Sequence, residues 1–390
     1  MSLLLAVDIG TTALELALIS DDGTVKTTGL LNPQRLYGSD VISRMNNATK
    51  PRLLAKMQSQ VRDAIYSTAL RELGIKKWDE LSRIVISGNT LMLHLFFGFD
   101  VSGMTRAPFK PFTLTFPITD WNGVRVIAIP CISTFVGGDI TSGLYGQSIT
   151  VSGQNILFAD LGTNGEIVLK KGNSFYAASV AAGPAFEGGN ISIGLPALSG
   201  AIYSVSIKKG FCRIKTISDI PPRGICGSGL IEAVYELKEN NIIDAQGSYI
   251  DDDIRNEGYP LYANNINDKL TLTQDDIRAF QEAKAAVCAG ILALLKVSDT
   301  AFTEIDSFIL AGSFGRHLDI KKASDIGLIP KALSSKVTLA GNSSLNGAIR
   351  LARNPKDLDA LTSFAKNVVS ISLADSDYFK EAYITSLPLA

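Results

Sequence analysis

The sequence predicts an α/β protein built from two related halves that face each other across a cleft, with a small inserted subdomain. Three short runs rich in Leu, Ile and Val, at 3–8, 13–19 and 24–30, are separated by tight-turn residues and predict a strand meander. The same pattern returns at 155–160, 166–170 and 174–180, offset by 152 residues. An internal repeat of this kind indicates two copies of one fold.

Helices and further strands fill the intervals between the meanders. Apolar spacing predicts helices at 53–73, 228–239, 273–297 and 343–353, a helix start at 90–97, and strands at 84–86 and 307–310. Three prolines in 102–123 predict an irregular or edge-strand connection, and the polar stretch 244–272 predicts a surface excursion. We therefore expect a first half over 1–150, with an inserted region at about 31–125, and a second half over 151–390, with an inserted region at about 190–300.

The composition is that of a globular protein without a strong overall field. Of the 390 residues, 46% are hydrophobic and 19% are charged. The 37 Lys and Arg residues nearly balance the 38 Asp and Glu residues, so we do not expect nucleic acid as a partner. No apolar run approaches the ~20 residues that a membrane helix needs, so we expect no membrane partner either.

Cysteine and histidine usage argues against several kinds of site. The four cysteines form no CxxC pair, so neither zinc nor a conventional iron–sulfur cluster is expected; they are Cys131, Cys212, Cys226 and Cys288. This usage fits a reducing cytoplasm. Only His94 and His317 are available, which argues against His-based metal sites and Ser-His-Asp chemistry. We expect His94 to be a core residue and His317 a surface residue.

Each copy of the meander places an acid at the end of its first strand. The two segments are Asp8-Ile9-Gly10-Thr11-Thr12 and Asp160-Leu161-Gly162-Thr163-Asn164. Backbone amides and hydroxyls in such a turn can bind phosphate oxygens, while the carboxylate holds a hydrated magnesium ion. One such turn is also an ordinary hairpin, but two at matching places in a repeat can clamp a triphosphate. A third segment, Ile309–Gly315, is a buried strand followed by a Gly turn whose glycines would let the backbone approach a base or ribose.

These three segments resemble the first phosphate, second phosphate and adenosine motifs of the actin, sugar-kinase and heat-shock-chaperone ATPase superfamily. Residues Gly137–Gly146 and Gly341–Gly347 resemble its two connecting segments. The resemblance implies duplicated actin-like, or ribonuclease H-like, ATPase halves on either side of a nucleotide cleft.

Further blocks resemble the ATPase module of the reductive activators of corrinoid proteins. The match covers nearly the whole chain, and the blocks that carry it are Asn32-Pro33-Gln34, Tyr37–Arg44, Gly88-Asn89-Thr90, Ala182–Gly189 and Arg223–Leu230. The resemblance implies ATP-driven reduction of cob(II)alamin to cob(I)alamin in a corrinoid protein, or remodelling of that protein. Full-length activators carry an iron–sulfur domain with clustered cysteines, which this sequence does not show. We therefore expect electrons from a separate ferredoxin-like donor, and leave a homodimer open.

The resemblance also implies ATP and Mg²⁺ as cofactors, and a set of site residues. Asp8 and Asp160 are expected to hold the magnesium ion. Asp139 is expected to position the attacking water, the alternative being a helix cap. Nucleotide contacts are expected from Asp8, Gly10, Thr11, Thr12, Gly138, Asp160, Gly162, Thr163, Asn164, Gly165, Glu166, Gly183, Glu187, Gly188, Gly227, Gly229, Gly312, Ser313, Phe314 and Gly315.

Three other functions stay open at this stage. One is a small-molecule kinase using the same cleft, although the sequence shows no sugar-kinase signature. Another is a module that senses ATP without turnover. The third is a dehydratase-activator-type ATPase, in which Cys131 and Cys226 would help to bridge an iron–sulfur cluster between two subunits. The residues around these cysteines do not match that family closely, so we expect buried structural thiols.

Overall fold

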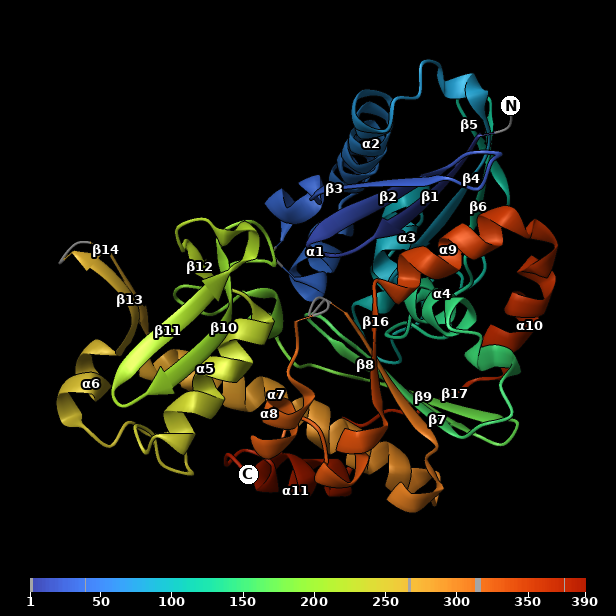
Figure 1. Cartoon of the computed structure of the whole chain (residues 1–390). Helices are drawn as coiled ribbons and strands as arrows, with labels where there is room; N and C mark the ends of the chain where they lie inside the picture. Colours follow the sequence, from blue (N-terminus) through green and yellow to red (C-terminus); the bar gives the residue numbers. More distant parts are fainter. Residues whose placement is uncertain (1–2, 39, 266–267, 313–316, 375) are drawn as a thin grey trace. The chain divides into compact units, whose positions relative to one another are not determined.

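A computed structural model describes the chain except for residues 1–2, 39, 266–267, 313–316 and 375 (Figure 1). The chain divides into two compact units. Unit 1 contains Met1–Ser152 and Asn342–Ser370, and unit 2 contains Gly153–Gly341 and Ile371–Ala390.

Unit 1 is built on a mixed sheet with the strand order β3-β2-β1-β4-β6-β5. The strands are β1 (Leu3–Ile9), β2 (Ala13–Ile19), β3 (Val25–Leu31), β4 (Leu81–Gly88), β5 (Thr119–Trp121) and β6 (Val124–Ala128). The predicted meander is present, because β1, β2 and β3 pair in antiparallel fashion. Strand β4 joins β1 in parallel, and β6 joins β4 in parallel. The proline-containing connection supplies β5, which is the edge strand.

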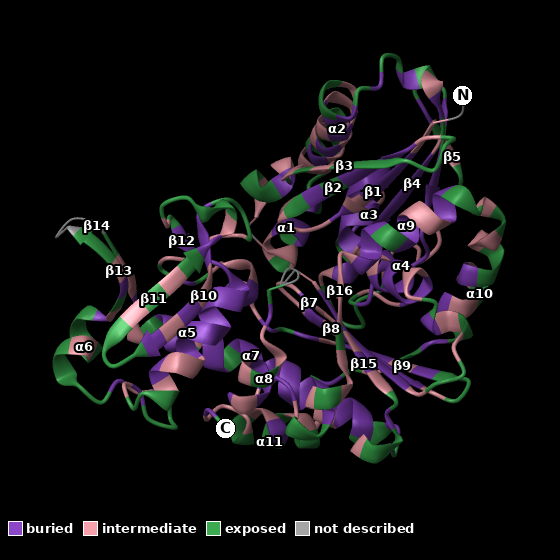
Figure 2. Cartoon of the chain, viewed as in Figure 1, coloured by how far each residue is buried: buried purple, intermediate pink, exposed green. Residues whose placement is uncertain are grey.

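Strands β1, β2 and β4 of this sheet are mostly buried, whereas the edge strand β3 is mostly exposed (Figure 2). On one face, Leu5 belongs to a core that includes Met57 of α2. On the other face, the small Ala6 packs in a second core with Leu345 of α9. The period of two along β1 thus fixes which residues meet which helix layer.

The helices of unit 1 are α1 (Val41–Ala48), α2 (Pro51–Thr68), α3 (Thr90–Phe97), α4 (Gly138–Gly146), α9 (Ser343–Arg353) and α10 (Leu358–Asn367). The helix predicted at 53–73 is α2 continued by the π-helical turn η2 (Ala69–Leu73). Helix α9 packs on α4 and β1, and this packing places 342–370 in unit 1 rather than with the second repeat.

Helices α4 and α9 cross at two glycines. A Cβ atom on Gly347 would lie 1.9 Å from the carbonyl oxygen of Ser142, and one on Gly146 would lie 2.8 Å from the Gly347 nitrogen. Neither position tolerates a side chain, since both neighbours are backbone. The close crossing holds the start of α9 beside the sheet, near the end of β1.

Unit 2 repeats the arrangement in its sheet, in which five strands run in the order β16-β15-β7-β8-β9. The strands are β7 (Ile156–Leu161), β8 (Gly165–Lys171), β9 (Ser174–Val180), β15 (Ser307–Gly312) and β16 (Val337–Gly341). Strands β7, β8 and β9 form the second antiparallel meander, and β15 joins β7 in parallel as β4 joins β1. The internal repeat is therefore confirmed at the level of topology.

Unit 2 also contains a smaller sheet, a hairpin and five helices among its described residues. The smaller sheet consists of β10 (Ala201–Lys208), β11 (Phe211–Thr216) and β12 (Gly224–Ile225), and the hairpin of β13 (Tyr259–Asn265) and β14 (Asp268–Leu272). The helices are α5 (Gly227–Glu239), α6 (Asp252–Glu257), α7 (Gln274–Val297), α8 (Ile320–Asp325) and α11 (Asp377–Thr385). The polar stretch 244–272 thus contains regular structure, because buried Leu261 and Leu272 anchor the hairpin.

Short elements complete the described chain. They are η1 (Pro33–Tyr37), η3 (Trp78–Glu80), η4 (Ser102–Met104), η5 (Ile149–Val151), η6 (Pro184–Glu187), η7 (Ile217–Asp219), η8 (Phe302–Glu304), η9 (Lys331–Lys336), η10 (Pro355–Asp357) and β17 (Val369–Ser370). Among the residues that the structure describes, no helix combines the length and the apolar character needed to cross a membrane.

Candidate functional site

Strand β1 carries the predicted metal-binding carboxylate, Asp8, close to its end. In the register of β1 and β2, Asp8 lies directly opposite Glu15, so two carboxylates occupy one cross-strand pair. Nδ2 of Asn342 donates to both of them, at 3.0 Å to Asp8 Oδ2 and 2.9 Å to Glu15 Oε2. Oγ of Ser344 donates to the other Asp8 oxygen at 2.7 Å. These donors offset part of the repulsion between the two acids.

The pKa of Asp8 is raised to about 6. Burial is the largest cause, and the nearby charge of Glu15 raises the pKa further, whereas the hydrogen bonds from Ser344 and Asn342 lower it. The ionised form is thus disfavoured despite two donors. A cation bound here would favour that form, so the donor set fits a magnesium ion.

The turn after β1 consists of Gly10, Thr11 and Thr12, which are all partly buried. A Cβ atom on Gly10 would lie 2.7 Å from the carbonyl oxygen of Ala13, so the tight turn requires glycine. The structure therefore places the predicted first phosphate turn directly beside Asp8.

Asp139 lies in the first turn of α4. The helix cap is Gly137, and Oδ1 of Asp139 accepts a hydrogen bond from the amide of Ile140 at 2.8 Å. Burial and then the charge of Asp8 raise the pKa of Asp139 to about 7. The structure thus brings Asp139 and Asp8 within electrostatic reach of each other, in unit 1. Gly138 is buried beside them against the carbonyl oxygen of Ile129.

Unit 2 repeats the pair of acids. Asp160, close to the end of β7, lies opposite Glu166 of β8, as Asp8 lies opposite Glu15. Oε1 of Glu166 accepts a hydrogen bond from Ser179 at 3.4 Å. The following turn is closed by a hydrogen bond from the Gly162 amide to the carbonyl oxygen of Asn164, at 2.9 Å.

Thr163, at the centre of this turn, directs two donors at one carboxylate. Its amide lies 3.2 Å from Glu187 Oε1, and its hydroxyl lies 2.9 Å from Glu187 Oε2. Glu187 ends η6, which is flanked by Gly183 and Gly188, both with positive φ. The contact shows that the turn presents its donors to an anion.

The remaining predicted glycines fall into two groups. Gly165, Gly227 and Gly229 are buried, and a Cβ atom on Gly227 would lie 2.3 Å from the carbonyl oxygen of Phe186. Gly312 has φ of 108°, and a Cβ atom there would lie 3.0 Å from Asp160 Oδ1. The third motif therefore reaches Asp160. Ser313, Phe314 and Gly315 lie outside the described residues.

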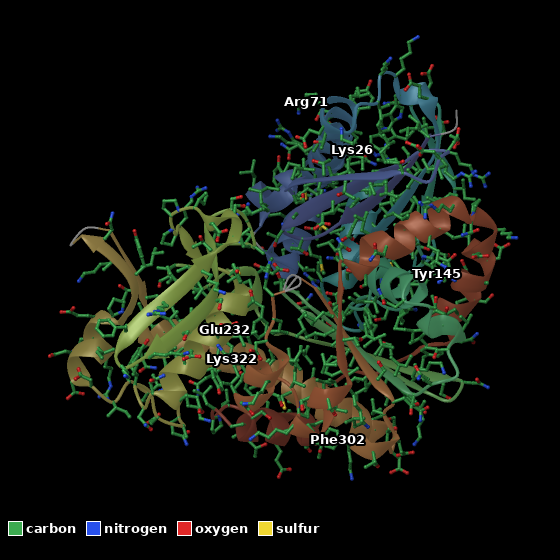
Figure 3. The ribbon with its side chains drawn as sticks, viewed as in Figure 1. Lys26, Arg71, Tyr145, Glu232, Phe302 and Lys322 are labelled. Atoms are coloured by element: carbon green, nitrogen blue, oxygen red, sulfur yellow. The ribbon has the colours of Figure 1, made fainter. Side chains whose placement is uncertain are left out.

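An ion-pair network joins helices α5 and α8 of unit 2. Lys322 of α8 lies 3.0 Å from Glu232 and 3.0 Å from Glu236, both of α5 (Figure 3). Helix α5 begins at Gly227, and α8 follows residues 313–316. The network therefore ties α5, whose first residues include the predicted nucleotide contacts Gly227 and Gly229, to α8.

The histidines and two of the cysteines lie as expected from the sequence. His94 is buried, and burial lowers its pKa; its Nδ1 lies 2.6 Å from the carbonyl oxygen of Thr90. His317 is exposed. Cys131 and Cys226 are buried, and burial raises the pKa of Cys131 to about 12. Within the described part of the chain, no three His, Cys, Asp or Glu side chains are grouped as a metal site would require.

Sequence reasoning did not identify Glu15, Asn342 and Ser344 as partners of Asp8. The sequence did offer one indication that Glu15 belongs to the site: it is a charged residue between the apolar Leu14 and Leu16 of a predicted strand. Asn342 and Ser344 lie in the second connecting segment, but nothing in the linear sequence pairs them with a residue more than 300 positions away.

Two family models match the chain. One, described as the RACo middle region, matches residues 3–152. The other, described as the C-terminal domain of RACo, the ASKHA domain, matches residues 154–390. Together they account for both units, and the ASKHA description agrees with the duplicated actin-like fold.

Individual relatives point the same way. The corrinoid activation enzyme RamQ of Eubacterium limosum is 29% identical, over 97% of this chain and 69% of the relative. A [Co(II) methylated amine-specific corrinoid protein] reductase of Methanosarcina barkeri is 24% identical, over 98% of this chain and 76% of the relative. A solved reductive activator for corrinoid, iron-sulfur protein superposes with a TM-score of 0.90 at 33% identity, covering 100% of this chain and 66% of that one. The chain thus spans about two thirds to three quarters of these relatives.

Proposed function

Because the chain belongs to the RACo family, we propose that it binds and hydrolyses magnesium–ATP to drive the reductive activation of a corrinoid protein. In the proposed reaction, cob(II)alamin in the partner gains one electron from a separate ferredoxin-like donor and becomes cob(I)alamin. The donor is oxidised by one electron, and ATP and water yield ADP and phosphate.

The observation that carries this proposal is the duplicated pair of acids. Asp8 faces Glu15 in unit 1, and Asp160 faces Glu166 in unit 2, each close to the end of the first meander strand and before a Gly-Thr turn. Directly opposed like charges cost stability unless a cation or donors compensate. An arrangement that occurs twice at matching positions supports a role in binding rather than in folding alone.

Binding roles follow from this geometry. Asp8 and Asp160 would hold the magnesium ion through its water shell. Thr11 and Thr12 in unit 1, and Thr163 and Asn164 in unit 2, would donate hydrogen bonds to phosphate oxygens. The carboxylate of Glu187 already occupies the Thr163 donors, which supports their use for a phosphate.

Asp139 would act as the base that orients the attacking water. Its pKa of about 7 lies near the operating pH, where a general base works best. Its short contact with the Ile140 amide holds Oδ1, which leaves Oδ2 to accept a proton from water. A bound magnesium ion would supply electrostatic stabilisation of the phosphate charge.

An energy source such as ATP is needed whenever the electron moves to an acceptor of lower reduction potential than its donor. Raising one electron by 100 mV costs about 2.3 kcal/mol. A difference in nucleotide affinity between two states of the protein can supply work on this scale.

The proposal is tested by following the γ-phosphate of labelled ATP under anaerobic conditions. We expect the label to appear as inorganic phosphate, with release faster in the presence of a corrinoid protein in the cob(II)alamin state. Transfer of the label to a small hydroxylated acceptor would instead identify a kinase. Binding of ATP without release of label in either condition would identify a sensor module.

A further inference from the structure

We propose that three helix-capping asparagines, Asn32, Asn89 and Asn342, are positioning residues for the first phosphate segment, Asp8–Thr12; the inference rests on the proposed function. Each asparagine caps a different helical element with Oδ1. Each also donates from Nδ2 to the Asp8–Thr12 segment. Each side-chain amide therefore uses its oxygen to cap a helix and its nitrogen to bind the Asp8–Thr12 segment.

Asn32 holds the backbone of the turn. Its Oδ1 accepts from the Gln34 amide at 2.9 Å, and its Nδ2 donates to the carbonyl oxygen of Gly10 at 2.8 Å. Its own amide donates to the carbonyl oxygen of Thr12 at 3.0 Å. Asn32 is 1% exposed, so these bonds form away from water, where they have the most effect on geometry.

Asn89 orients the Thr11 hydroxyl. Its Oδ1 accepts from the Met92 amide at 3.0 Å; a backbone N–H can only donate, so this contact fixes which end of the side chain is oxygen. Nδ2 therefore donates to Thr11 Oγ1, at 3.0 Å. Because the hydroxyl oxygen accepts this bond, its proton is left to donate to a phosphate oxygen.

Asn342 acts on the carboxylate. Its Oδ1 accepts from the Leu345 amide at 2.7 Å, so Nδ2 is the end that faces Asp8 and Glu15. The bond holds Oδ2 of Asp8 in one orientation while Ser344 holds Oδ1. The metal-binding carboxylate is thereby fixed by the cap of α9.

A buried arginine completes the inner side of the turn. Nη2 of Arg44 donates to the carbonyl oxygen of Thr11 at 2.9 Å and to that of Gly38 at 3.0 Å, and the side chain is fully buried. The carbonyl oxygens of Gly10, Thr11 and Thr12 all accept internal donors as a result. The blocks around Asn32, Arg44 and Asn89, which carried the family resemblance, share this one turn.

Asparagine is the residue that this arrangement requires. Serine and aspartate cap helices about as well, but neither has a donor that can reach the turn. Asn→Ser at a cap therefore removes the contact with the turn and keeps the cap. This separation makes the inference testable without unfolding the helix.

The test compares Asn89→Ser and Asn342→Ser with Asn47→Ser. Asn47, on α1, makes one bond of the same type, from Nδ2 to the carbonyl oxygen of Tyr37 at 2.9 Å, away from Asp8–Thr12. Magnesium–ATP affinity is measured by calorimetry and ligand-free stability by thermal melting. We expect both cap variants to bind at least fivefold more weakly than wild type, with Asn47→Ser within twofold and all three melting temperatures within a few degrees of one another.

Two outcomes overturn the inference and can be told apart. A wild-type chain that binds no magnesium–ATP overturns the proposed function and this inference with it. A wild-type chain that binds, with both cap variants within twofold of Asn47→Ser, overturns the inference alone. If one cap variant does not fold, the magnesium–ATP affinities of the other cap variant and of Asn89→Asp decide the question. Asn89→Asp keeps the helix cap but places an acceptor, instead of a donor, against Thr11 Oγ1.

Discussion

Thr163 and Glu187 form a two-point contact in which the amide and the hydroxyl of one residue donate to the two carboxylate oxygens of the other, at 3.2 and 2.9 Å. The contact resembles the way a turn holds a phosphate, with a protein carboxylate in its place. A Cβ atom on Gly162 would lie 2.7 Å from Glu187 Oε1, so the absence of a side chain at 162 allows the contact. A phosphate that used the Thr163 donors would therefore compete with the carboxylate of Glu187.

Glu187→Ala should change the binding of two ligands in opposite directions. Without metal, pyrophosphate should bind threefold to tenfold more tightly, because the Thr163 donors are free. Magnesium–ATP should bind more weakly, because the carboxylate of Glu187, which is one of the predicted nucleotide contacts, is lost. Calorimetry with each ligand measures both effects. Equal shifts in one direction would show that Glu187 has only one of these roles.

Asp8→Ala and Asp160→Ala should each weaken magnesium–ATP binding or turnover at least tenfold, about 1.4 kcal/mol. The reason is the loss of a carboxylate that, in the proposed site, would hold the metal's water shell. Calorimetry and phosphate release are the measurements. Normal affinity and turnover in both variants would show that the site is misplaced.

Asp139→Asn should lower ATP hydrolysis by about 10²–10⁴-fold while ATP affinity stays largely unchanged, since the loss falls on the transition state. The N-cap residue of α4 is Gly137 and not Asp139. Oδ1 of Asp139 nevertheless accepts a hydrogen bond from the Ile140 amide. Single-turnover hydrolysis and calorimetry separate the two effects. A nearly silent substitution would assign Asp139 to the helix turn alone.

The raised pKa of Asp139 also predicts how stability depends on pH. The folded protein holds this proton up to about pH 7, whereas the unfolded chain releases it near pH 4. The contribution of this carboxyl group to the free energy of unfolding is therefore fully present below pH 4 and is lost as the pH rises to 7. Thermal melts without nucleotide should show Asp139→Asn gaining about 2–4 °C over wild type between pH 5 and 8. A constant difference across this range would contradict the assigned pKa.

Much of the fold could be predicted because it depends on local patterns. The apolar runs and tight turns of the meanders, and the Asp-x-Gly-Thr segments at their first strand ends, are visible in the sequence and recur 152 residues apart. The positions of the two Gly-Thr turns followed directly from these patterns. The hairpin within 244–272 did not, because its few apolar residues are diluted by polar ones.

Contacts between distant segments could not be predicted in the same way. Residues 342–370 belong to unit 1 because α9 crosses α4 at Gly146 and Gly347. This crossing depends on how the two helices fit together in three dimensions, which no local sequence pattern reveals. The bond from Asn342 to Asp8 depends on that crossing and joins residues 334 positions apart. The partners of the site thus came from tertiary packing, whereas its principal acids came from the sequence.

If ATP drives the reduction of a corrinoid protein, the anaerobic absorption spectrum of the corrinoid shows it most directly. The chain is incubated with a corrinoid protein in the cob(II)alamin state and a low-potential one-electron donor, with and without magnesium–ATP. We predict conversion to cob(I)alamin that requires ATP, and that slows at least tenfold with Asp160→Ala. Conversion at the same rate without ATP, or no conversion in either condition, would contradict ATP-driven reduction by this chain.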